Sequence, residues 1–231
     1  METAADIVFF WVMRMMMFGL YRTGKVPFKT VYLHGLVNDK HGKKMSKSKG
    51  NVVNPLDISG NFGTDALRMG LIIGNVPASD VSFSDDKIRG YKNFANKIWN
   101  ITRFVLTSVD GFDVDSKPEV TSTDQKILAG LKEMTKEVTT DIDAYRFYMA
   151  SEKIYRYVWH TFADVIIEES KAAVNGLDEK AKKSIQYTLY QILITCLKLL
   201  HPFMPFVTEE IWNSLPHKNK LLLMIESWPV V

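Results

Sequence analysis

Amphipathic helical patterns run from Ser84 almost to the end of the 231-residue sequence and constrain its fold more than any other feature. In the first pattern, apolar side chains recur every three or four positions, which places them on one face of an α-helix. They are Ile88, Tyr91, Phe94, Ile98, Ile101 and Val105. Similar patterns predict helices from about Thr123, over 144–171, over 178–200 and over 205–215. Four or five amphipathic helices joined by short polar turns predict a helical bundle.

The first 75 residues follow a different pattern. An apolar segment, Ile7 to Phe18, lies within a predicted helix over 6–21, and an apolar, β-branched run predicts a strand over 30–37. Such near-continuous apolar strands are typical of parallel sheets that are covered on both faces. A helix that is apolar all round needs partners on all sides, so we expect this one to be buried on most sides.

Two short helices are predicted between the strand and the bundle. One begins near Pro55 and ends at Gly60, and the next is capped by Thr64. Helix, strand, loop and helix in this order are typical of a parallel α/β sheet, but only one strand is clear. We therefore expect a mostly α-helical protein in which 1–75 are the last part of a larger α/β domain and 76–231 form the bundle.

Composition excludes several classes of protein. The apolar segment has 12 residues with Arg14 inside it, whereas a membrane-spanning helix needs roughly 20 apolar residues. It also lacks the features of a signal peptide. Cys196 is the only cysteine, so the chain can build neither a disulfide nor a zinc cluster from cysteines. These features predict a cytoplasmic protein with no protein-bound metal and no membrane partner.

The positive charge of the chain is concentrated in a short loop. Residues 1–83 carry a net charge of +4 and the remainder −1. Five lysines occur within ten residues in this loop, namely Lys40, Lys43, Lys44, Lys47 and Lys49. The loop follows the carboxyl end of the predicted strand, where open parallel sheets bind ligands. By charge alone it could be a solvated turn or a patch for nucleic acid, but mobile lysines can also stabilise a leaving pyrophosphate.

The order of residues in this loop resembles a known family. "KMSKS" followed by "GN" is similar to the mobile ATP loop of class I aminoacyl-tRNA synthetases. The stretches "DIVFFWVMRM", "PFKTVYLHGLV", "KMSKSKGNVVNPLD", "GTDALRMGLI", "NFANKIWNITRF" and "HPFMPFVTEEIW" occur in the order found in the valyl branch. Isoleucyl and leucyl enzymes share the loop and the bundle, so they remain alternatives. The resemblance implies a Rossmann-type catalytic domain followed by an anticodon-binding bundle.

The resemblance also implies roles for particular residues of the first domain. Lys44 and Lys47 match the catalytic lysines that bind the ATP phosphates, with Lys47 as the principal contact, and Ser46 shapes the same loop. His34 and Gly35 match positions near the adenosine, where a glycine permits close backbone approach. Trp11 matches the family's tryptophan at the amino-acid side chain, although simple core packing explains it equally well. Mg²⁺ is expected only with ATP, as substrate.

In the bundle, one face of the first helix is expected to contact the tRNA anticodon. Asparagine and arginine side chains can bond base edges, and an exposed tryptophan can stack on an unpaired base. Helical spacing of three and four places Asn93, Asn96, Asn100 and Arg103 on one face, and Trp99 is an aromatic that could stack on a base. A solvated polar face is the alternative interpretation.

The implied function is valine–tRNA ligation, with tRNA(Val), ATP and valine as partners. No "H-x-G-H" motif, which supplies the family's other grip on ATP, occurs in the sequence. We therefore expect this chain to be inactive by itself and to need the missing N-terminal half of a synthetase. The alternatives are a stand-alone tRNA-binding module, half of a split synthetase, or a structural partner that completes a sheet in another chain.

Overall fold

A computed structural model describes residues 1–216 and 221–229. The chain forms two compact units. The N-terminal unit comprises residues 1–57 and 74–86, and the helical unit comprises 58–73 and 87–231. The division of function at residue 75 stays a prediction, because compactness alone does not define a functional domain.

The N-terminal unit contains two small parallel sheets. In the first, β1 (Glu2–Ala4) pairs with β2 (Tyr32–His34), and Thr3 lies opposite Leu33. In the second, β3 (Val37–Asn38) pairs with β4 (Val81–Ser82). The single strand expected over 30–37 is therefore wrong in detail. The strand divides at Gly35 and Leu36, and its partners were not predicted because strands of two or three residues carry no readable alternation.

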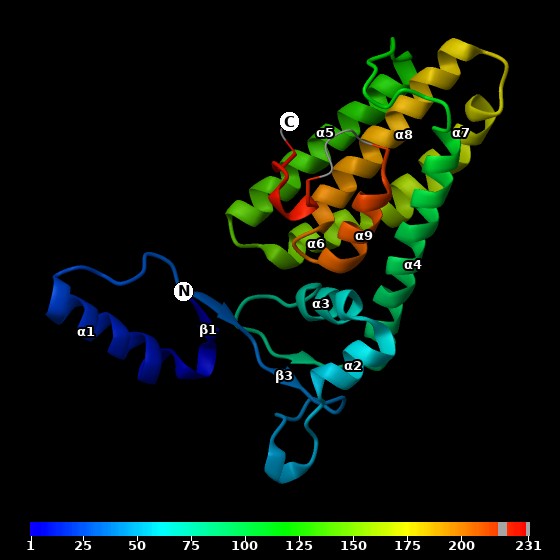
Figure 1. The fold of residues 1–231 in the computed structure, drawn as a ribbon. Coiled ribbons are helices and arrows are strands. Elements are labelled where there is room, and N and C mark those ends of the chain that lie inside the picture. The colour runs from blue at the N-terminus through cyan, green and yellow to red at the C-terminus, as the bar shows by residue number, and fades with distance from the viewer. Residues whose placement is uncertain (217–220, 230–231) are drawn as a thin grey trace. The chain divides into compact units, whose positions relative to one another are not determined.

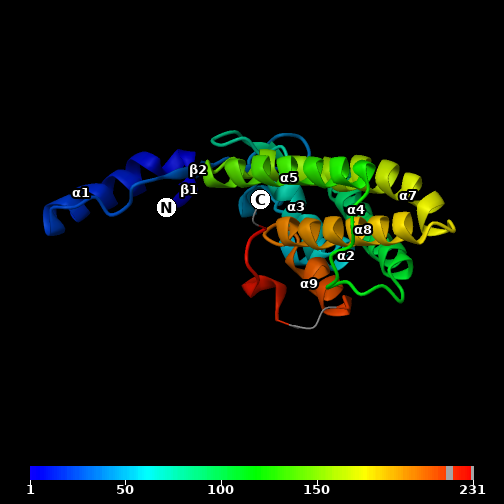
Figure 2. The same ribbon diagram turned by 90° about the horizontal axis from the view of Figure 1, so that it is seen from above.

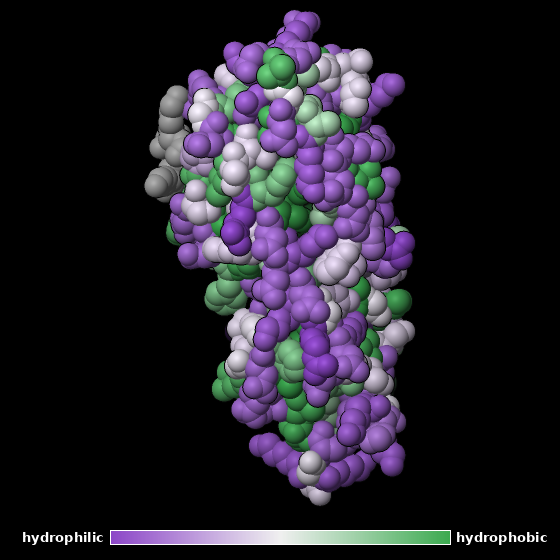
Figure 3. All heavy atoms as spheres, turned by 90° about the vertical axis from the view of Figure 1, so that its right-hand side faces the viewer, coloured by the Kyte–Doolittle hydropathy of each residue, from purple (hydrophilic) through white to green (hydrophobic). Residues whose placement is uncertain are grey.

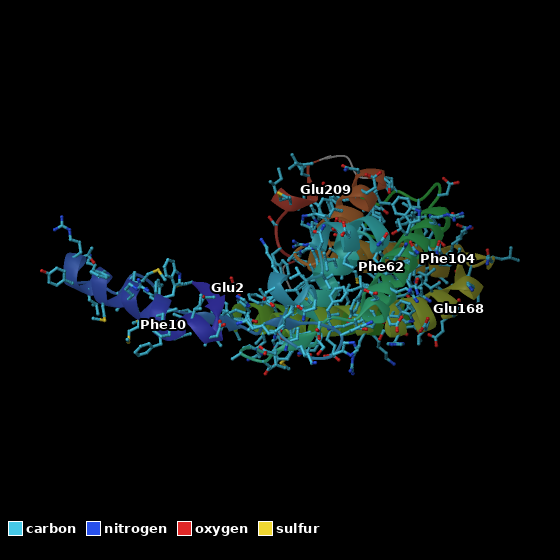
Figure 4. The ribbon with its side chains drawn as sticks, turned by 90° about the horizontal axis from the view of Figure 1, so that it is seen from below. Glu2, Phe10, Phe62, Phe104, Glu168 and Glu209 are labelled. Atoms are coloured by element: carbon cyan, nitrogen blue, oxygen red, sulfur yellow. The ribbon has the colours of Figure 1, made fainter. Side chains whose placement is uncertain are left out.

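The apolar segment near the N-terminus is helical, as predicted. A 3-10 turn (Ala5–Ile7) leads into a π-helix (Val8–Val12) and then α1 (Met13–Thr23). Gly24, with φ of 67°, ends α1 in the left-handed conformation that glycine tolerates. The expected burial of this helix is wrong for this chain. Phe10 is 67% exposed, and the side chains of the helix project from the ribbon (Figure 4).

The helical unit is built from long helices, as expected. α2 (Pro55–Phe62) joins the two units, and the 3-10 turn Lys47–Lys49 precedes it. The remaining elements are α3 (Thr64–Ile72), α4 (Asp85–Ser108), α5 (Ser122–Asp143), α6 (Phe147–Arg156), a π-helix (Tyr157–Ile166), α7 (Ile167–Val174), α8 (Glu179–Leu200), α9 (Pro205–Ser214) and a 3-10 turn (Leu223–Ile225). α5 and α8 lie side by side in both ribbon views (Figures 1 and 2).

The core of the helical unit confirms the predicted helix faces. The apolar positions of α4 are buried except Tyr91, which is half-buried against Tyr155 with ring centroids 5.9 Å apart. Cys196 on α8 is buried, and burial raises the pKa of its thiol. The side of the molecule shown in Figure 3 is largely hydrophilic, with apolar residues scattered over it.

Three predicted helix ends are wrong. α2 continues through Gly60 to Phe62, because Gly63, with φ of 93°, supplies the break instead. Thr64 is the first residue of α3 rather than its cap, and its hydroxyl pairs with that of Ser59 at 2.5 Å. The third bundle helix begins at residue 147 rather than 144, because Tyr145 has a φ of 58°.

α3 is fixed to the corner between α8 and α9 by two charged side chains. Asp65 accepts hydrogen bonds from the backbone N–H groups of Phe206 and Val207, at 3.2 and 2.6 Å. Arg68 donates to the carbonyl oxygens of Pro202 and Phe203. Asp65 thus caps the N-terminus of α9, for which no side chain of the local sequence provides a cap. Burial raises the pKa of Asp65, although the two N–H groups act in the opposite direction.

Candidate functional site

The lysine loop leaves β3 through a turn organised by Asp39. One carboxylate oxygen of Asp39 accepts hydrogen bonds from the backbone N–H groups of His41 and Lys43, both at 2.9 Å. The other accepts from the side-chain amide of Asn51 at 2.8 Å. The Asn51 amide, followed by the Lys43 N–H, lowers the pKa of Asp39. A carboxylate therefore ties the two ends of the loop together.

Asn51 completes the base of the loop from its far end. Its side-chain oxygen accepts a hydrogen bond from the backbone N–H of Ser46 at 2.9 Å, and its amide nitrogen also donates to the carbonyl of Lys44 at 3.3 Å. Asn38 and Lys44 form an isolated antiparallel bridge beside it. Residues 44–46 are thus held against the base of the loop.

The two lysines expected to act on ATP occupy different environments. Lys44 forms an ion pair with Asp6, with 3.2 Å between the ammonium and the carboxylate. Lys47 begins the exposed 3-10 turn and has no ion-pair partner among the residues that the structure describes. Gly50, with φ of 65°, ends that turn. The loop therefore presents an ammonium without an ion pair beyond a fixed base.

The other residues expected at ATP are Ser46, His34 and Gly35, and each has contacts within this chain. The Ser46 hydroxyl is 3.2 Å from that of Ser48. The Nδ1 atom of His34 lies 2.9 Å from the carbonyl oxygen of Gly35, and its Nε2 atom lies 3.3 Å from the carboxylate of Glu2. A side chain on Gly35 would place Cβ only 1.7 Å from the carbonyl oxygen of Ser79. The chain's own backbone therefore requires this glycine, whatever binds nearby.

Trp11, the residue expected at the amino-acid side chain, lies on the π-helix Val8–Val12 and is half exposed. An apolar hollow of about 460 Å³ lies along this π-helix and α1, but Trp11 does not line it. The hollow is bounded by Phe9, Phe10, Met13, Arg14, Met17, Phe18 and Tyr21. Plain core packing does not account for Trp11 within this chain, since half of its surface stays open.

The residues expected to face RNA lie together on α4. Asn93, Asn96, Trp99, Asn100 and Arg103 are all exposed or half-buried, on the side of the helix opposite its buried apolar residues. Lys97 lies next to these residues, and its side chain reaches the π-helix Tyr157–Ile166. Its ammonium lies 3.0 Å from Asp164 and 5.4 Å from the ring centre of Trp159. The arrangement leaves amide and guanidinium groups open to a ligand along more than two turns of one helix.

Other kinds of site are not evident in the described residues. Nowhere in residues 1–216 and 221–229 do three or more His, Cys, Asp or Glu side chains group in a way that could hold a metal ion. No helix in the same residues has the length and hydropathy that crossing a membrane requires. The lysine loop and the face of α4 are two surfaces that the sequence predicts to bind a ligand and that the structure leaves exposed.

Sequence reasoning overlooked the groups that hold the loop. Asp39, Asn51 and Asp80 were not singled out, yet Asp39 and Asn51 close the base of the loop. Asp80 accepts from the backbone N–H of Leu36 at 2.8 Å. A signal was present for Asn51, because it directly follows the glycine that ends the lysine-rich stretch, and asparagine in loops commonly bonds nearby backbone.

Comparison with known protein families divides the chain into two matching segments. Residues 1–84 match the family described as tRNA synthetases class I (I, L, M and V). Residues 124–231 match the anticodon-binding domain of tRNA ligase. The first segment contains the lysine loop, and the second contains most of α5 and all of α6 to α9.

Curated relatives match almost the whole chain. A Valine--tRNA ligase of Clostridium acetobutylicum is 46% identical over 98% of this chain. Another, of Bacillus subtilis, is 44% identical over 99%. In both comparisons the chain spans 26% of the relative's length, about a quarter.

Solved structures share the fold. The methionyl-tRNA synthetase of Mycobacterium tuberculosis, solved with methionyl-adenylate, covers 92% of the chain with a TM-score of 0.76 and 25% identity, and the match spans 43% of that protein. The LeuRS of Agrobacterium radiobacter K84, solved with tRNA and LeuAMS, covers 99% with a TM-score of 0.77. The match spans 28% of that protein, and its 21% identity supports the fold alone. The class I synthetase match, the anticodon-domain match and the Valine--tRNA ligase relatives together support the assignment of this chain as a fragment of a class I valyl-tRNA synthetase.

Proposed function

We propose that this chain supplies the ATP loop and the anticodon-binding helices of an enzyme that ligates valine to tRNA(Val). The observation that carries the proposal is the match of Valine--tRNA ligases along 98–99% of the chain. In that function the valine carboxylate attacks the α-phosphorus of ATP and displaces pyrophosphate. A hydroxyl at the 3′ end of the tRNA then takes the valyl group from the resulting adenylate, and AMP leaves.

Lys47 is the residue best suited to the first step. Negative charge grows on the pyrophosphate as its bond to the α-phosphorus breaks, and a nearby ammonium stabilises that charge. The Lys47 ammonium is exposed and carries no ion pair within the described residues, so no protein carboxylate must be displaced before it reaches a phosphate. Lys44 must first break its ion pair with Asp6. This pair is exposed, so breaking it costs only about 0–1 kcal/mol. Mg²⁺ would enter with ATP as part of the substrate.

Binding of tRNA is assigned to the open face of α4. Exposed amides can bond the edges of unpaired bases, and Trp99 offers a stacking surface. Residues 84–231 have nearly balanced charge, which suits contact with a few bases better than neutralisation of many phosphates. Trp11 is proposed to contact valine. His34, Gly35 and Ser46 are proposed to lie at ATP.

A chimaera tests the proposal directly. The matching segment of the Clostridium acetobutylicum Valine--tRNA ligase is replaced by this chain, and valine-dependent ATP–pyrophosphate exchange is measured. We expect exchange within about tenfold of the parent enzyme, since the segment would supply an equivalent loop. A chimaera that folds and binds tRNA but does not exchange would contradict the assigned role of the loop. The isolated chain is expected to show no exchange.

A further inference from the structure

The base of the lysine loop carries an unusually complete set of hydrogen bonds for an exposed segment. The side chains of Asp39 and Asn51 make five hydrogen bonds, counting their shared bond once, and the other four go to His41, Lys43, Lys44 and Ser46. The backbone of Asp39 adds two more at 2.9 Å, donating to the carbonyl of Lys43 and accepting from the N–H of Gly42. Beyond residue 46 the contacts become sparse.

The contacts divide the loop into a fixed part and a free part. Residues 43, 44 and 46 are tied to Asp39 and Asn51 through their backbone groups. Among the described residues, the backbone of the turn Lys47–Lys49 is bonded only locally, by the N–H groups of Lys49 and Gly50 to the carbonyls of Ser46 and Lys47. Lys47 therefore lies one residue beyond the last backbone group that Asn51 holds. A small rotation at Ser46 would carry the Lys47 ammonium a long way, because a lysine side chain is long.

We propose that Asn51 and Asp39 are positioning residues that act through Lys47, holding the base of the loop so that Lys47 swings about a fixed point at Ser46. The proposal rests on the assignment of Lys47 to ATP. Neither Asn51 nor Asp39 needs to touch ATP, because both use their polar atoms on the loop itself. Loss of this support would lower the rate through geometry, since a misplacement of about 1 Å at a reacting centre can cost about 100-fold in rate.

A reciprocal exchange of the two side chains tests the clamp without changing the net charge. In Asp39→Asn alone, two amides would face each other, and in Asn51→Asp alone, two carboxylates would face each other. In the double variant Asp39→Asn/Asn51→Asp, the amide now at position 39 can donate to the carboxylate now at position 51, whose second oxygen can accept from Ser46. The 3.3 Å bond to the Lys44 carbonyl is lost, and a carboxylate oxygen would lie near that carbonyl oxygen in its place.

The first measurement uses the 231-residue chain alone and does not depend on catalysis. Hydrogen exchange at the Ser46 amide, followed by NMR, should accelerate about tenfold in Asn51→Ala, because the amide loses its acceptor. It should accelerate by a similar factor in Asp39→Asn alone and in Asn51→Asp alone, because the side chain at position 51 loses its hydrogen bond to the side chain at position 39. The double exchange variant should return it to within about threefold of the wild-type chain. Unchanged exchange in Asn51→Ala, with the fold retained by circular dichroism, would overturn the clamp.

The second measurement uses the chimaera and asks whether Asn51 acts through Lys47. We expect Asn51→Ala to lower the kcat of ATP–pyrophosphate exchange about 10–100-fold, with the KM for valine nearly unchanged. In the Asn51→Ala background, Lys47→Ala should lower kcat by less than about a further tenfold, because a misplaced lysine already contributes little to catalysis. Independent, multiplicative losses would overturn the positioning role. An inactive wild-type chimaera would instead contradict the proposed function, and the Ser46 amide would still decide the clamp.

Discussion

Removal of the Asp65 carboxylate should destabilise the helical unit much more than removal of an ordinary helix cap. Asp65 lies on α3 and accepts the two N–H groups that open α9, and only 7% of its surface is exposed. Asp178 makes a matched control, because it also accepts two N–H groups, at 3.0 and 3.2 Å, but it is exposed and caps its own helix, α8.

The difference between the two sites sets the expected magnitudes. In Asp178→Ala, water can reach the released N–H groups, so the loss should be about 1 kcal/mol of unfolding free energy. In Asp65→Ala, the freed N–H groups of Phe206 and Val207 lose a buried acceptor, at about 1–3 kcal/mol each. We expect a total loss of about 2–6 kcal/mol. Asp65→Asn keeps one oxygen for two donors and should lose about half as much.

Urea denaturation of the full chain, followed by circular dichroism at the helix band, measures these losses. Each variant is compared with the wild-type chain at neutral pH, and equal slopes against urea show that the same surface is exposed on unfolding. Equal losses for Asp65→Ala and Asp178→Ala would refute the reasoning, because they would mean that α3 contributes no more to α9 than a local cap.

Two further predictions concern the helical unit. Burial alone would raise the pKa of Asp141, but hydrogen bonds from Lys153 and Arg146 lower it. Its contribution should be present above the unfolded pKa of about 4 and disappear as the pH falls through the lower folded value. Asp141→Asn should therefore lower the free energy of unfolding by about 1.5–3 kcal/mol at neutral pH, measured by urea titration. The variant's stability should also fall less steeply than that of the wild-type chain as the pH becomes acidic. A difference between the two that stays constant down to strongly acidic pH would contradict this. In the chimaera, Asn96→Ala should raise the KM for tRNA about tenfold in aminoacylation and leave tRNA-free ATP–pyrophosphate exchange unchanged. An equal effect on both assays would mean that α4 is not part of the RNA-binding surface.

The bundle could be predicted from the sequence because its helices are long and periodic. The buried positions of α4 follow directly from their spacing, and the starts of α8 and α9 lie where the sequence places them. What the sequence did not reveal depends on contacts between distant residues. The sequence indicates that Asp65 and Arg68 fix their helix and its junction with the bundle, but only the fold identifies the partner of Asp65, the start of α9, 141 residues away.

The N-terminal unit was harder to predict for two physical reasons. Its strands are two or three residues long, too short for periodicity to register. The apolar helix was expected to be buried, but burial depends on partners, and Phe10 and Tyr21 remain exposed in this chain. The motif around Lys47 can be recognised from the sequence because its residue order is specific, whereas its support by Asp39 is visible only in the structure.

The most direct test of the account is ATP–pyrophosphate exchange by the chimaera with Lys47→Ala beside Lys40→Ala. Both lysines are exposed and belong to the same charged loop, so the pair separates position from charge. The account predicts that Lys47→Ala lowers valine-dependent exchange about 10²–10³-fold, and that Lys40→Ala lowers it less than about threefold, since screened surface charges act weakly. Similar losses for both variants would mean that the loop contributes only general positive charge, and the specific role of Lys47 would be wrong.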